Sequence, residues 1–212
     1  MSRGTRTNVA RNDRQKEELR EVILTAARQI VVHNGFAALS IRKLAKEIGY
    51  APGTIYLYFE NRDTLTREIC LQGFAELSEQ LDSVVEMADP QERLIALLHA
   101  YADFAIQHPE TYRLSFMEDP KFAEEMMRAA PLEEENGAGR RAFTLIVEAV
   151  AALQQSGTIR AEEDAQLLAE MFWTSIHGVV SLKLIYPAFP ATPTDVMVQK
   201  MSGCLLEGCA PR

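Results

Sequence analysis

Hydrophobic residues recur at every third or fourth position along most of this chain, a spacing that gathers them on one face of an α-helix. Over residues 16–34 the pattern forms one apolar stripe, made of Leu19, Val22, Ile23, Ala26, Ala27, Ile30 and Val31. Gly35 follows the stripe, and a glycine directly after the last periodic residue is typical of a helix end. The first predicted helix therefore spans residues 16–34.

Two short helices joined by a tight turn are predicted next. Ser40 precedes an apolar-periodic stretch and suits the N-cap of a helix over about residues 41–48. A three-residue turn follows, after which Pro52 fits the first position of a third helix, because its fixed φ and missing N–H are harmless there. Asn61 is the expected cap of a longer helix over residues 62–87.

The remainder of the chain has the same helical periodicity. Helices are predicted over residues 90–107, 109–116, 120–130, 140–157 and 162–186, with a loop at 131–139 and a final short helix capped by Thr194. No long alternating run is present, and no Asn-Gly turn lies between alternating segments. The pattern therefore predicts an all-α protein of about nine or ten helices.

The charge is distributed unevenly along the chain. The formal net charge is −8, but residues 1–70 carry +4 and residues 71–212 carry −12. Because salt at 0.1 M screens charges beyond about 10 Å, the basic N-terminal part can attract phosphate although the chain as a whole is acidic. Residues 1–15 are polar and arginine-bearing, so we expect a disordered basic tail, which is either simply solvated or reaches into a minor groove.

Several protein classes lack support in the sequence. No stretch approaches 18 uncharged apolar residues, and the N-terminus has no apolar segment of the signal-peptide kind, so no membrane span or secretion signal is expected. The odd number of cysteines (Cys70, Cys204, Cys209) is typical of a reduced cytoplasmic protein, with a Cys204–Cys209 redox pair as the alternative. No catalytic motif, phosphate loop or metal-binding cluster is visible. We expect a cytoplasmic protein that is not an enzyme and needs no metal or cofactor.

The segment over residues 40–62 carries the functional signal. A helix, a glycine-containing turn and a short second helix form the geometry that lays the second helix into the major groove of DNA. Arginine pairs with phosphate or guanine, hydroxyls bond phosphates or base edges, glycine permits close backbone approach, and leucine contacts a thymine methyl. The residues of these types expected to face DNA are Arg42, Gly53, Thr54, Tyr56, Leu57 and Tyr58.

A dense set of small, aromatic and basic positions lies between Val22 and Leu65. It consists of Ala26-Ala27, Asn34-Gly35-Phe36, Ser40-Ile41-Arg42-Lys43-Leu44-Ala45, Gly49, Gly53-Thr54-Ile55-Tyr56-x-Tyr58-Phe59 and Asn61-Arg62-x-x-Leu65. In this combination the stretch resembles the DNA-binding domain of the TetR family of transcriptional regulators. The resemblance implies a three-helix DNA-reading module that a fourth helix joins to a ligand-binding body.

The resemblance also implies roles for single residues. Ser40 and Arg42 are expected near the DNA backbone at the start of the second helix, and Arg62 is expected to contact phosphate where the family usually has lysine. The expected recognition surface consists of Gly53, Thr54, Tyr56, Leu57 and Tyr58. The positions that depart from the family's usual residues are Val31 (phenylalanine), Tyr50 (a small aliphatic residue) and Ala51 (a serine or threonine cap). These changes bear on operator preference and not on the fold.

The implied organisation has three parts: a tail at 1–15, a DNA-binding domain at 16–66 with its helix-turn-helix at about 40–59, and a regulatory and dimerisation domain at 67–212. The family implies that long C-terminal helices pair with their two-fold mates, which we expect of helices at about 140–156 and 162–186. Such a homodimer places two recognition helices roughly 34 Å apart on double-stranded DNA, and hence on a palindromic operator.

The C-terminal part is rich in large apolar side chains that either form an ordinary core or line an effector cavity. Candidate effector-binding residues are Tyr101, Phe104, Tyr112, Phe116, Met117, Phe143, Phe172, Trp173 and His177. His177 is the notable polar group in a largely apolar helical stretch, and it acts either as a satisfied structural histidine or as a donor to a ligand. The motifs Trp173-x-x-x-His177-Gly178 and His108-Pro109-Glu110-x-Tyr112-Arg113 resemble one subgroup of the family's C-terminal domains.

Three functional hypotheses follow. The first is a repressor that a small hydrophobic or aromatic effector, not identified by the sequence, releases from its operator. The second is a DNA-binding factor without such a ligand, of an architectural or protein-partnered kind, which a filled interior would favour. An activator role is not distinguished from repression by the sequence. The third, an enzyme fused to a helix-turn-helix, has no motif to support it.

Overall fold

The computed structural model describes residues 4–117, 138–189 and 191–211, and every regular element within these ranges is a helix. The elements in chain order are α1 (Gly4–Asn34), the short 3-10 helix η1 (Phe36–Ala38), α2 (Ile41–Glu47), α3 (Pro52–Tyr56), α4 (Arg62–Val85), α5 (Pro90–Gln107), α6 (Pro109–Phe116), α8 (Ala138–Gln155), α9 (Ala165–Ile185) and α10 (Thr194–Gly208). The predicted all-α fold is confirmed. None of these helices is long and apolar enough to cross a membrane.

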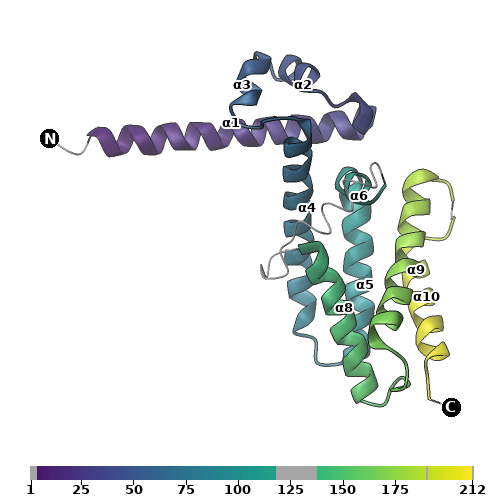
Figure 1. Cartoon of the computed structure of the whole chain (residues 1–212). Coiled ribbons are helices and arrows are strands. Elements are labelled where there is room, and N and C mark those ends of the chain that lie inside the picture. Colours follow the sequence, from purple (N-terminus) through teal and green to yellow (C-terminus); the bar gives the residue numbers. More distant parts are fainter. Residues whose placement is uncertain (1–3, 118–137, 190, 212) are drawn as a thin grey trace.

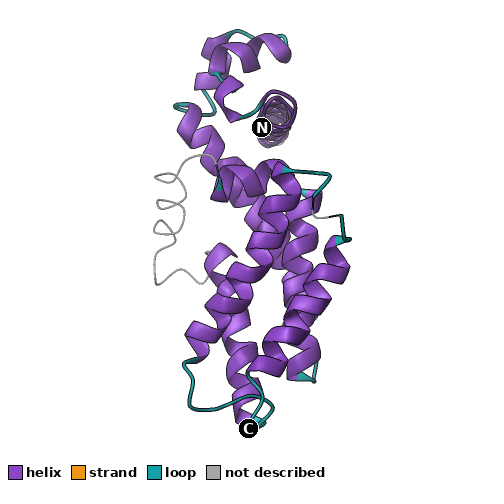
Figure 2. Ribbon diagram, turned by 90° about the vertical axis from the view of Figure 1, so that its right-hand side faces the viewer, coloured by secondary structure: helices purple, strands orange, loops and turns teal. Residues whose placement is uncertain are grey.

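The molecule has two parts that share α4. In Figure 1, α1, α2 and α3 form a small domain at one end, and α4 runs from it into a larger helical body built with α5, α6, α8, α9 and α10. Figure 2 shows the same arrangement from the side. The first half of α4 contacts α1, where Arg20 and Glu68 form an ion pair of 2.6 Å, and its second half packs against α5 and α8.

The first helix is longer than the sequence predicted. α1 begins at Gly4, so the prediction of a disordered tail is wrong for residues 4–15. No proline interrupts residues 4–34, and Arg14 and Glu18 form an i,i+4 ion pair of 3.1 Å on the helix surface. In Figure 1 the N-terminal half of α1 projects past α2 and α3, away from the body.

The predicted helix ends of the small domain are confirmed. Gly35 has a φ of 77° and donates its N–H to the carbonyl of Val31, which is the left-handed conformation that glycine adopts at low cost. Ser40 caps α2 by accepting from the N–H of Lys43 at 3.2 Å, and Asn61 caps α4 by accepting from Thr64 at 2.8 Å. α3 begins at Pro52, and no side chain caps it.

The body helices follow the prediction with small shifts at their ends. α9 begins at Ala165 instead of 162, because Asp164 caps it by accepting from the N–H of Gln166. Thr194 is the first residue of α10 and not its cap, since Pro193 occupies the position before the helix. The helix predicted at 120–130 and most of the loop predicted at 131–139 lie outside the described residues.

The helix predicted at about 140–156, which was expected to join the dimer interface, corresponds to α8. Five residues of its apolar face are buried within the protomer at 0–2% exposure, namely Ala142, Ile146, Ala149, Val150 and Leu153, whereas Leu145 and Ala152 are half-buried. α8 lies against α4, α5 and α9, so its stripe closes the core of its own chain. An apolar stripe indicates that a face is covered, but not which element covers it.

Candidate DNA-binding surface and effector site

The position of α3 is set by two buried side chains. Ile55 is fully buried and Phe59 is 2% exposed, and both belong to the core that also contains Leu44 of α2. The turn before α3 is closed by the N–H of Tyr50, which donates to the carbonyl of Ala45 at 2.9 Å. Since one side of this short helix is anchored, its opposite side is directed outward.

The predicted DNA-facing residues lie on or beside this outward side. Leu57 is 83% exposed and Tyr56 is 55% exposed, and Arg42 and Gly53 are also exposed. In the part of the chain that the structure describes, no atom beyond the adjoining helix backbone and the chain neighbours lies within 4 Å of a Cβ built at Gly53, so the backbone there is open to a close ligand. Thr54 and Tyr58 are half-buried and present only part of their side chains.

The remaining predicted positions flank α3. Ser40 uses its hydroxyl to cap α2 and stays exposed. The guanidinium of Arg62 lies 4.6 Å from the ring centroid of Phe36, a cation–π contact that restricts the side chain at the start of α4, and Asp63 lies 3.7 Å from its Nε. Arg62 is thus held in place near the recognition surface.

Tyr50 is a surface residue that the sequence reasoning did not include among the contacts. It is 46% exposed in the turn between α2 and α3, directly before the recognition helix. The sequence could have indicated this position, because Tyr50 stands where the family that the sequence resembles usually has a small aliphatic residue. Its ring adds exposed aromatic surface directly before the start of α3.

His177 is the centre of a hydrogen-bonded cluster formed by three helices of the body. Its Nδ1 lies 2.8 Å from the hydroxyl of Tyr101 in α5 and 2.8 Å from that of Tyr112 in α6. Tyr101 is 1% exposed and Tyr112 is fully buried. In the tautomer whose ring proton lies on Nε2, the single lone pair of Nδ1 accepts from one of the two phenol O–H groups.

The cluster is uncharged at neutral pH. Burial lowers the pKa of His177, so the imidazole stays neutral near pH 7. Burial also raises the pKa of Tyr101 and of Tyr112, so both phenols keep their protons. The site can therefore exchange hydrogen bonds with a polar group, but it offers no formal charge.

Aromatic rings surround this cluster. Trp173 stacks on Tyr101 with ring centroids 4.2 Å apart, Phe116 meets the His177 ring edge-on at 5.3 Å, and Phe143 meets Trp173 at 6.0 Å. Phe116, Phe143, Trp173 and His177 are only half-buried. Their open faces are the part of the cluster that a ligand can contact.

Three predicted effector residues lie apart from these contacts or contribute little to them. Phe104 is fully buried and stacks on His108 at 5.2 Å, and Phe172 is 1% exposed within the core. Met117 is half-buried at the end of α6. Phe74 of α4, which was not among the predicted effector residues, has its ring 6.0 Å from that of Phe116.

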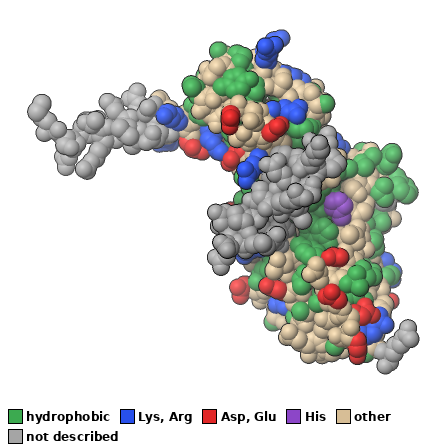
Figure 3. All heavy atoms as spheres, viewed as in Figure 1, with side chains coloured by type: hydrophobic (Ala, Val, Ile, Leu, Met, Phe, Trp, Pro, Cys, Tyr) green, Lys and Arg blue, Asp and Glu red, His purple; other side chains and the backbone are tan. Residues whose placement is uncertain are grey.

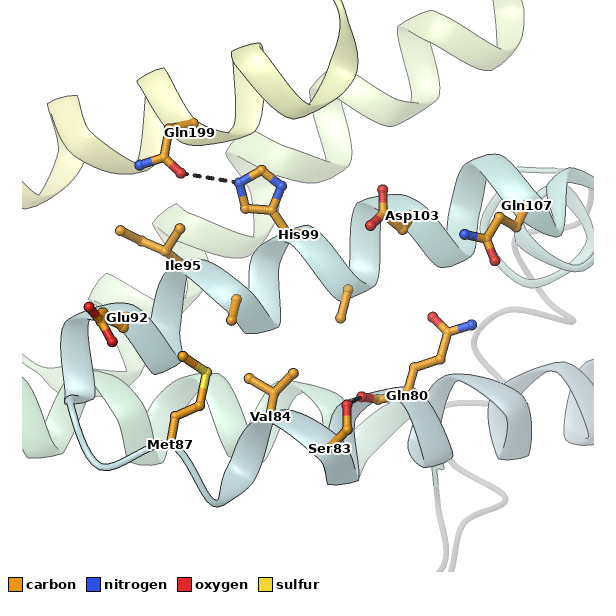
Figure 4. Close-up of a pocket in the computed structure, with 12 residues that line it drawn as sticks. Gln80, Ser83, Val84, Met87, Glu92, Ile95, His99, Asp103, Gln107 and Gln199 are labelled. Carbon is orange, nitrogen blue, oxygen red and sulfur yellow. Dashed lines mark hydrogen bonds between the residues drawn. The ribbon is translucent and has the colours of Figure 1, made fainter.

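A hollow in the surface of the body lies between α4, α5 and α10. Figure 4 shows this open groove of about 650 Å³, with Val84 and Ile95 among its apolar residues and Asp103 on its polar border. His99 and Gln199 meet across it at 3.3 Å. None of the predicted effector residues lines it. The described residues contain no group of three or more His, Cys, Asp or Glu side chains able to hold a metal ion.

Comparison with known families identifies the class of protein. A family model described as the tetracyclin repressor-like C-terminal domain matches residues 94–201, and one described as bacterial regulatory proteins of the tetR family matches residues 23–69. The two matches fall on the body and on the helix-turn-helix domain. The chain belongs to the TetR family, and the family resemblance drawn from the segment between Val22 and Leu65 is confirmed.

Individual relatives are more distant. The helix-turn-helix transcriptional regulator YobS of Bacillus subtilis (strain 168) is 26% identical over 97 residues, which are 46% of this chain and 51% of that protein. The chain spans about half the length, or less, of the curated relatives it matches most strongly. A solved structure from Rhodococcus sp. RHA1, of unknown function, is 27% identical with a TM-score of 0.72, covering 91% of this chain and 96% of that one.

A further solved structure was determined with a ligand. The transcriptional regulator FadR from Bacillus subtilis, in complex with stearoyl-CoA, has a TM-score of 0.72 at 18% identity, and the match covers 89% of this chain and 98% of that chain. At this identity the match shows a shared fold alone.

Proposed function

We propose that this chain is a dimeric transcription factor that binds operator DNA through α3 and is released by a small hydrophobic or aromatic effector bound in the body. The observation that carries the proposal is the bare outer side of α3. Leu57 and Tyr56 are 83% and 55% exposed although Ile55 beside them is fully buried. Large apolar side chains exposed at the tip of a helix-turn-helix suit the floor of a major groove.

The charge distribution supports this assignment. On the face seen in Figure 3, acidic side chains gather toward the end of the body that lies away from the helix-turn-helix domain. Arg42 and Arg62 stand beside α3 and are assigned to phosphates, and Ser40 is assigned to the backbone next to them. Gly53, Thr54, Tyr56, Leu57 and Tyr58 are assigned to the groove.

A selection experiment tests the DNA-binding half. The protein selects duplexes from a random DNA pool, and the operator Kd is then measured for Leu57→Ala. We expect a loss of roughly 10-fold, because a lost base contact costs about 1–3 kcal/mol. Leu71→Ala, at 45% exposure on α4, is the matched control and should leave Kd unchanged. Equal effects of both variants would refute the assignment of α3.

The exposed side of α9, together with α10, is the proposed dimer interface. Exposed apolar residues recur along α9 at helical spacing: Leu167, Met171, Leu182 and Ile185. Gly178 lies in the same row. Among the described residues, no atom outside its own helix backbone and chain neighbours lies within 4 Å of a Cβ built there, so a partner helix has room to approach closely. Val196 of α10 is 50% exposed and extends the surface.

Light scattering after size-exclusion chromatography tests this interface. Leu182→Glu is expected to yield monomers, because a two-fold interface would bury the new carboxylate twice. Ile106→Glu on α5 is the matched control, since Leu182 and Ile106 are both 40% exposed. A dimer that survives Leu182→Glu, or that is lost equally in both variants, would contradict the proposed face.

The effector is assigned to the cluster around His177. Its uncharged hydrogen-bonding groups and half-buried rings suit an apolar or aromatic molecule with one polar atom near the imidazole. FadR binds stearoyl-CoA, and a long acyl chain is one apolar group of this kind. The C-terminal family match spans both the His108–Arg113 and Trp173–Gly178 motifs, which supports the proposed subgroup. Three free cysteines are in keeping with a reducing, cytoplasmic setting.

Trp173 gives a direct test, because it is the single tryptophan of the chain. A panel of uncharged aromatic and long-chain aliphatic compounds is titrated while tryptophan fluorescence is followed. We expect some members to change the emission and to raise the operator Kd. Tyr112→Phe should weaken their binding, while Tyr186→Phe, an exposed tyrosine beyond α9, should not. Compounds that change the emission equally in both variants would contradict the site.

A factor without a small-molecule ligand is the second candidate. The close packing of the cluster favours it, since Tyr101 and Tyr112 are at most 1% exposed and Trp173 stacks directly on Tyr101. A panel that changes neither fluorescence nor operator binding would favour this candidate over the first.

A further inference from the structure

Three elements meet at one carboxylate at the junction between the DNA-binding domain and the body. Glu76 of α4 has its Oε1 3.7 Å from Nη1 of Arg28 in α1, and its Oε2 3.2 Å from Nδ1 of His108, the residue between α5 and α6. Arg28 also donates from Nη2 to Gln72 of α4 at 2.7 Å. Glu76 is therefore shared by the DNA-binding domain and by the start of α6.

The His108 end of this junction is firmly held. The imidazole stacks on Phe104 with ring centroids 5.2 Å apart. Oε2 of Glu76 is buried without a hydrogen-bond partner, and Nδ1 of His108 is the polar atom beside it, at 3.2 Å. Burying a carboxylate oxygen costs free energy because the oxygen leaves water, and that cost rises when the polar group beside it moves away. Displacing His108 therefore disturbs Glu76, and with it the Arg28 contact.

α6 links His108 to the cluster around His177. It is eight residues long, and the N–H of Tyr112 donates to the carbonyl of His108 at 3.0 Å within its first turn. The hydroxyl of the same Tyr112 contacts His177 in α9. One turn of helix thus joins the proposed effector site to the shared carboxylate.

α6 cannot slide along α4 freely. A Cβ built at Gly73 of α4 would lie 2.1 Å from Cγ2 of Thr111 in α6, so the two helices touch where only glycine leaves room. The Phe74–Phe116 contact lies farther along the same two helices. Any displacement of α6 is therefore transmitted to the middle of α4.

We propose that Glu76 is a positioning residue that couples the Tyr112–His177 cluster to the DNA-binding domain, by bridging Arg28 of α1 and His108 at the start of α6. The inference rests on the proposed function, because it assigns a route by which that effector site acts on operator binding. The coupling can be tested without an effector. Tyr112→Phe removes the hydroxyl contact to His177 and so perturbs the cluster end of the connection between the cluster and α1.

A double-mutant cycle tests the coupling. Operator Kd is measured by fluorescence anisotropy on a labelled duplex selected from a random pool, for the wild type, Glu76→Gln, Tyr112→Phe and the double variant. Distant and independent sites give additive effects. We expect Tyr112→Phe to change Kd at least threefold when Glu76 is present, and less than 1.5-fold in the Glu76→Gln background.

A matched control separates positioning from general destabilisation. Glu79→Gln neutralises an exposed carboxylate one turn along α4, and the effect of Tyr112→Phe should be the same in this background as in the wild type. Thermal unfolding of every variant checks the fold. If Tyr112→Phe has equal effects with glutamate or glutamine at position 76, including no effect in either, the coupling is refuted.

A second readout does not depend on DNA. Amide hydrogen exchange of residues 16–59 is compared in the same four proteins, and Tyr112→Phe should speed exchange there only when Glu76 is present. If no duplex is selected, the proposed DNA-binding function fails, but the exchange cycle still decides the coupling. Exchange in these residues that is unaffected by Tyr112→Phe would overturn the inference even if the protein binds DNA.

Discussion

The uncapped start of α3 gives a prediction whose size follows from the structure. Ala51 precedes the helix with φ of −75° and ψ of 146° and offers no side-chain acceptor. This extended backbone is the conformation that a capping residue adopts. A serine hydroxyl at this position would accept from the N–H groups at the second and third helical positions, Gly53 and Thr54, as Ser40 does for Lys43 in α2.

The expected gain for Ala51→Ser is about 1 kcal/mol in the free energy of unfolding, the usual value of an N-cap relative to alanine. For a chain of this size that corresponds to a rise in Tm of about 2–4 °C. Urea unfolding followed by circular dichroism measures the gain. Ser40→Ala is the mirror experiment and should lose a similar amount, because it removes the existing cap of α2.

Operator binding separates two ways of adding the cap. Ala51→Ser adds no charge and should leave the operator Kd within about twofold. Ala51→Asp should cap α3 equally well, but it should raise the operator Kd because it places a carboxylate beside phosphates. If Ala51→Ser leaves the unfolding free energy unchanged while Ser40→Ala lowers it, the reasoning fails, because the end of α3 would not be limited by its cap.

Further predictions concern packing, protonation and thiol reactivity. Gly73→Ala should destabilise the protein by about 1–3 kcal/mol in urea unfolding through its clash with Thr111, and Thr111→Ala should restore most of the loss; an additive double variant would contradict the clash. Burial lowers the pKa of His177, so the unfolded state binds the proton more readily than the folded state. The free energy of unfolding should therefore fall as the pH drops below the ordinary histidine pKa of about 6.5. His177→Gln should reduce this dependence on pH, and an unchanged dependence would refute the assignment. Cys204 is exposed whereas burial raises the pKa of Cys70 to about 11, so a thiol reagent should modify Cys204 quickly and Cys70 only after unfolding.

Much of the fold could be predicted because its signals are local. Capping by Ser40 and Asn61, the turn at Gly35 and the start of α3 at Pro52 depend on side chains or backbone angles of a few neighbouring residues, and all four are found as predicted. The first helix was predicted too short because polarity was taken for disorder. A polar segment that continues an existing helix does not have to start a helix of its own, because the neighbouring residues have already formed the first turn.

The sites could be predicted only in part, because long-range packing decides them. Aromatic composition indicated the cluster, but Phe104 and Phe172 have the same character as Trp173 and lie in the core instead. The contact of Tyr101 and Tyr112 with one imidazole nitrogen joins positions 76 and 65 residues away from His177, which no periodicity reveals. Glu76 gave no sequence signal, since its role depends on two partners from other helices.

The 24 residues of α4 form a rod of about 36 Å that both parts of the molecule share. A rigid rod magnifies small rotations: each degree of tilt about its body end displaces its far end by about 0.6 Å. Phe74 lies near the middle of this rod, so a displacement of about 0.5 Å there moves the far end by about 1 Å. Under the proposed function, chemically different effectors need only produce the same slight tilt, so the effector site can diverge while the contacts with DNA are preserved.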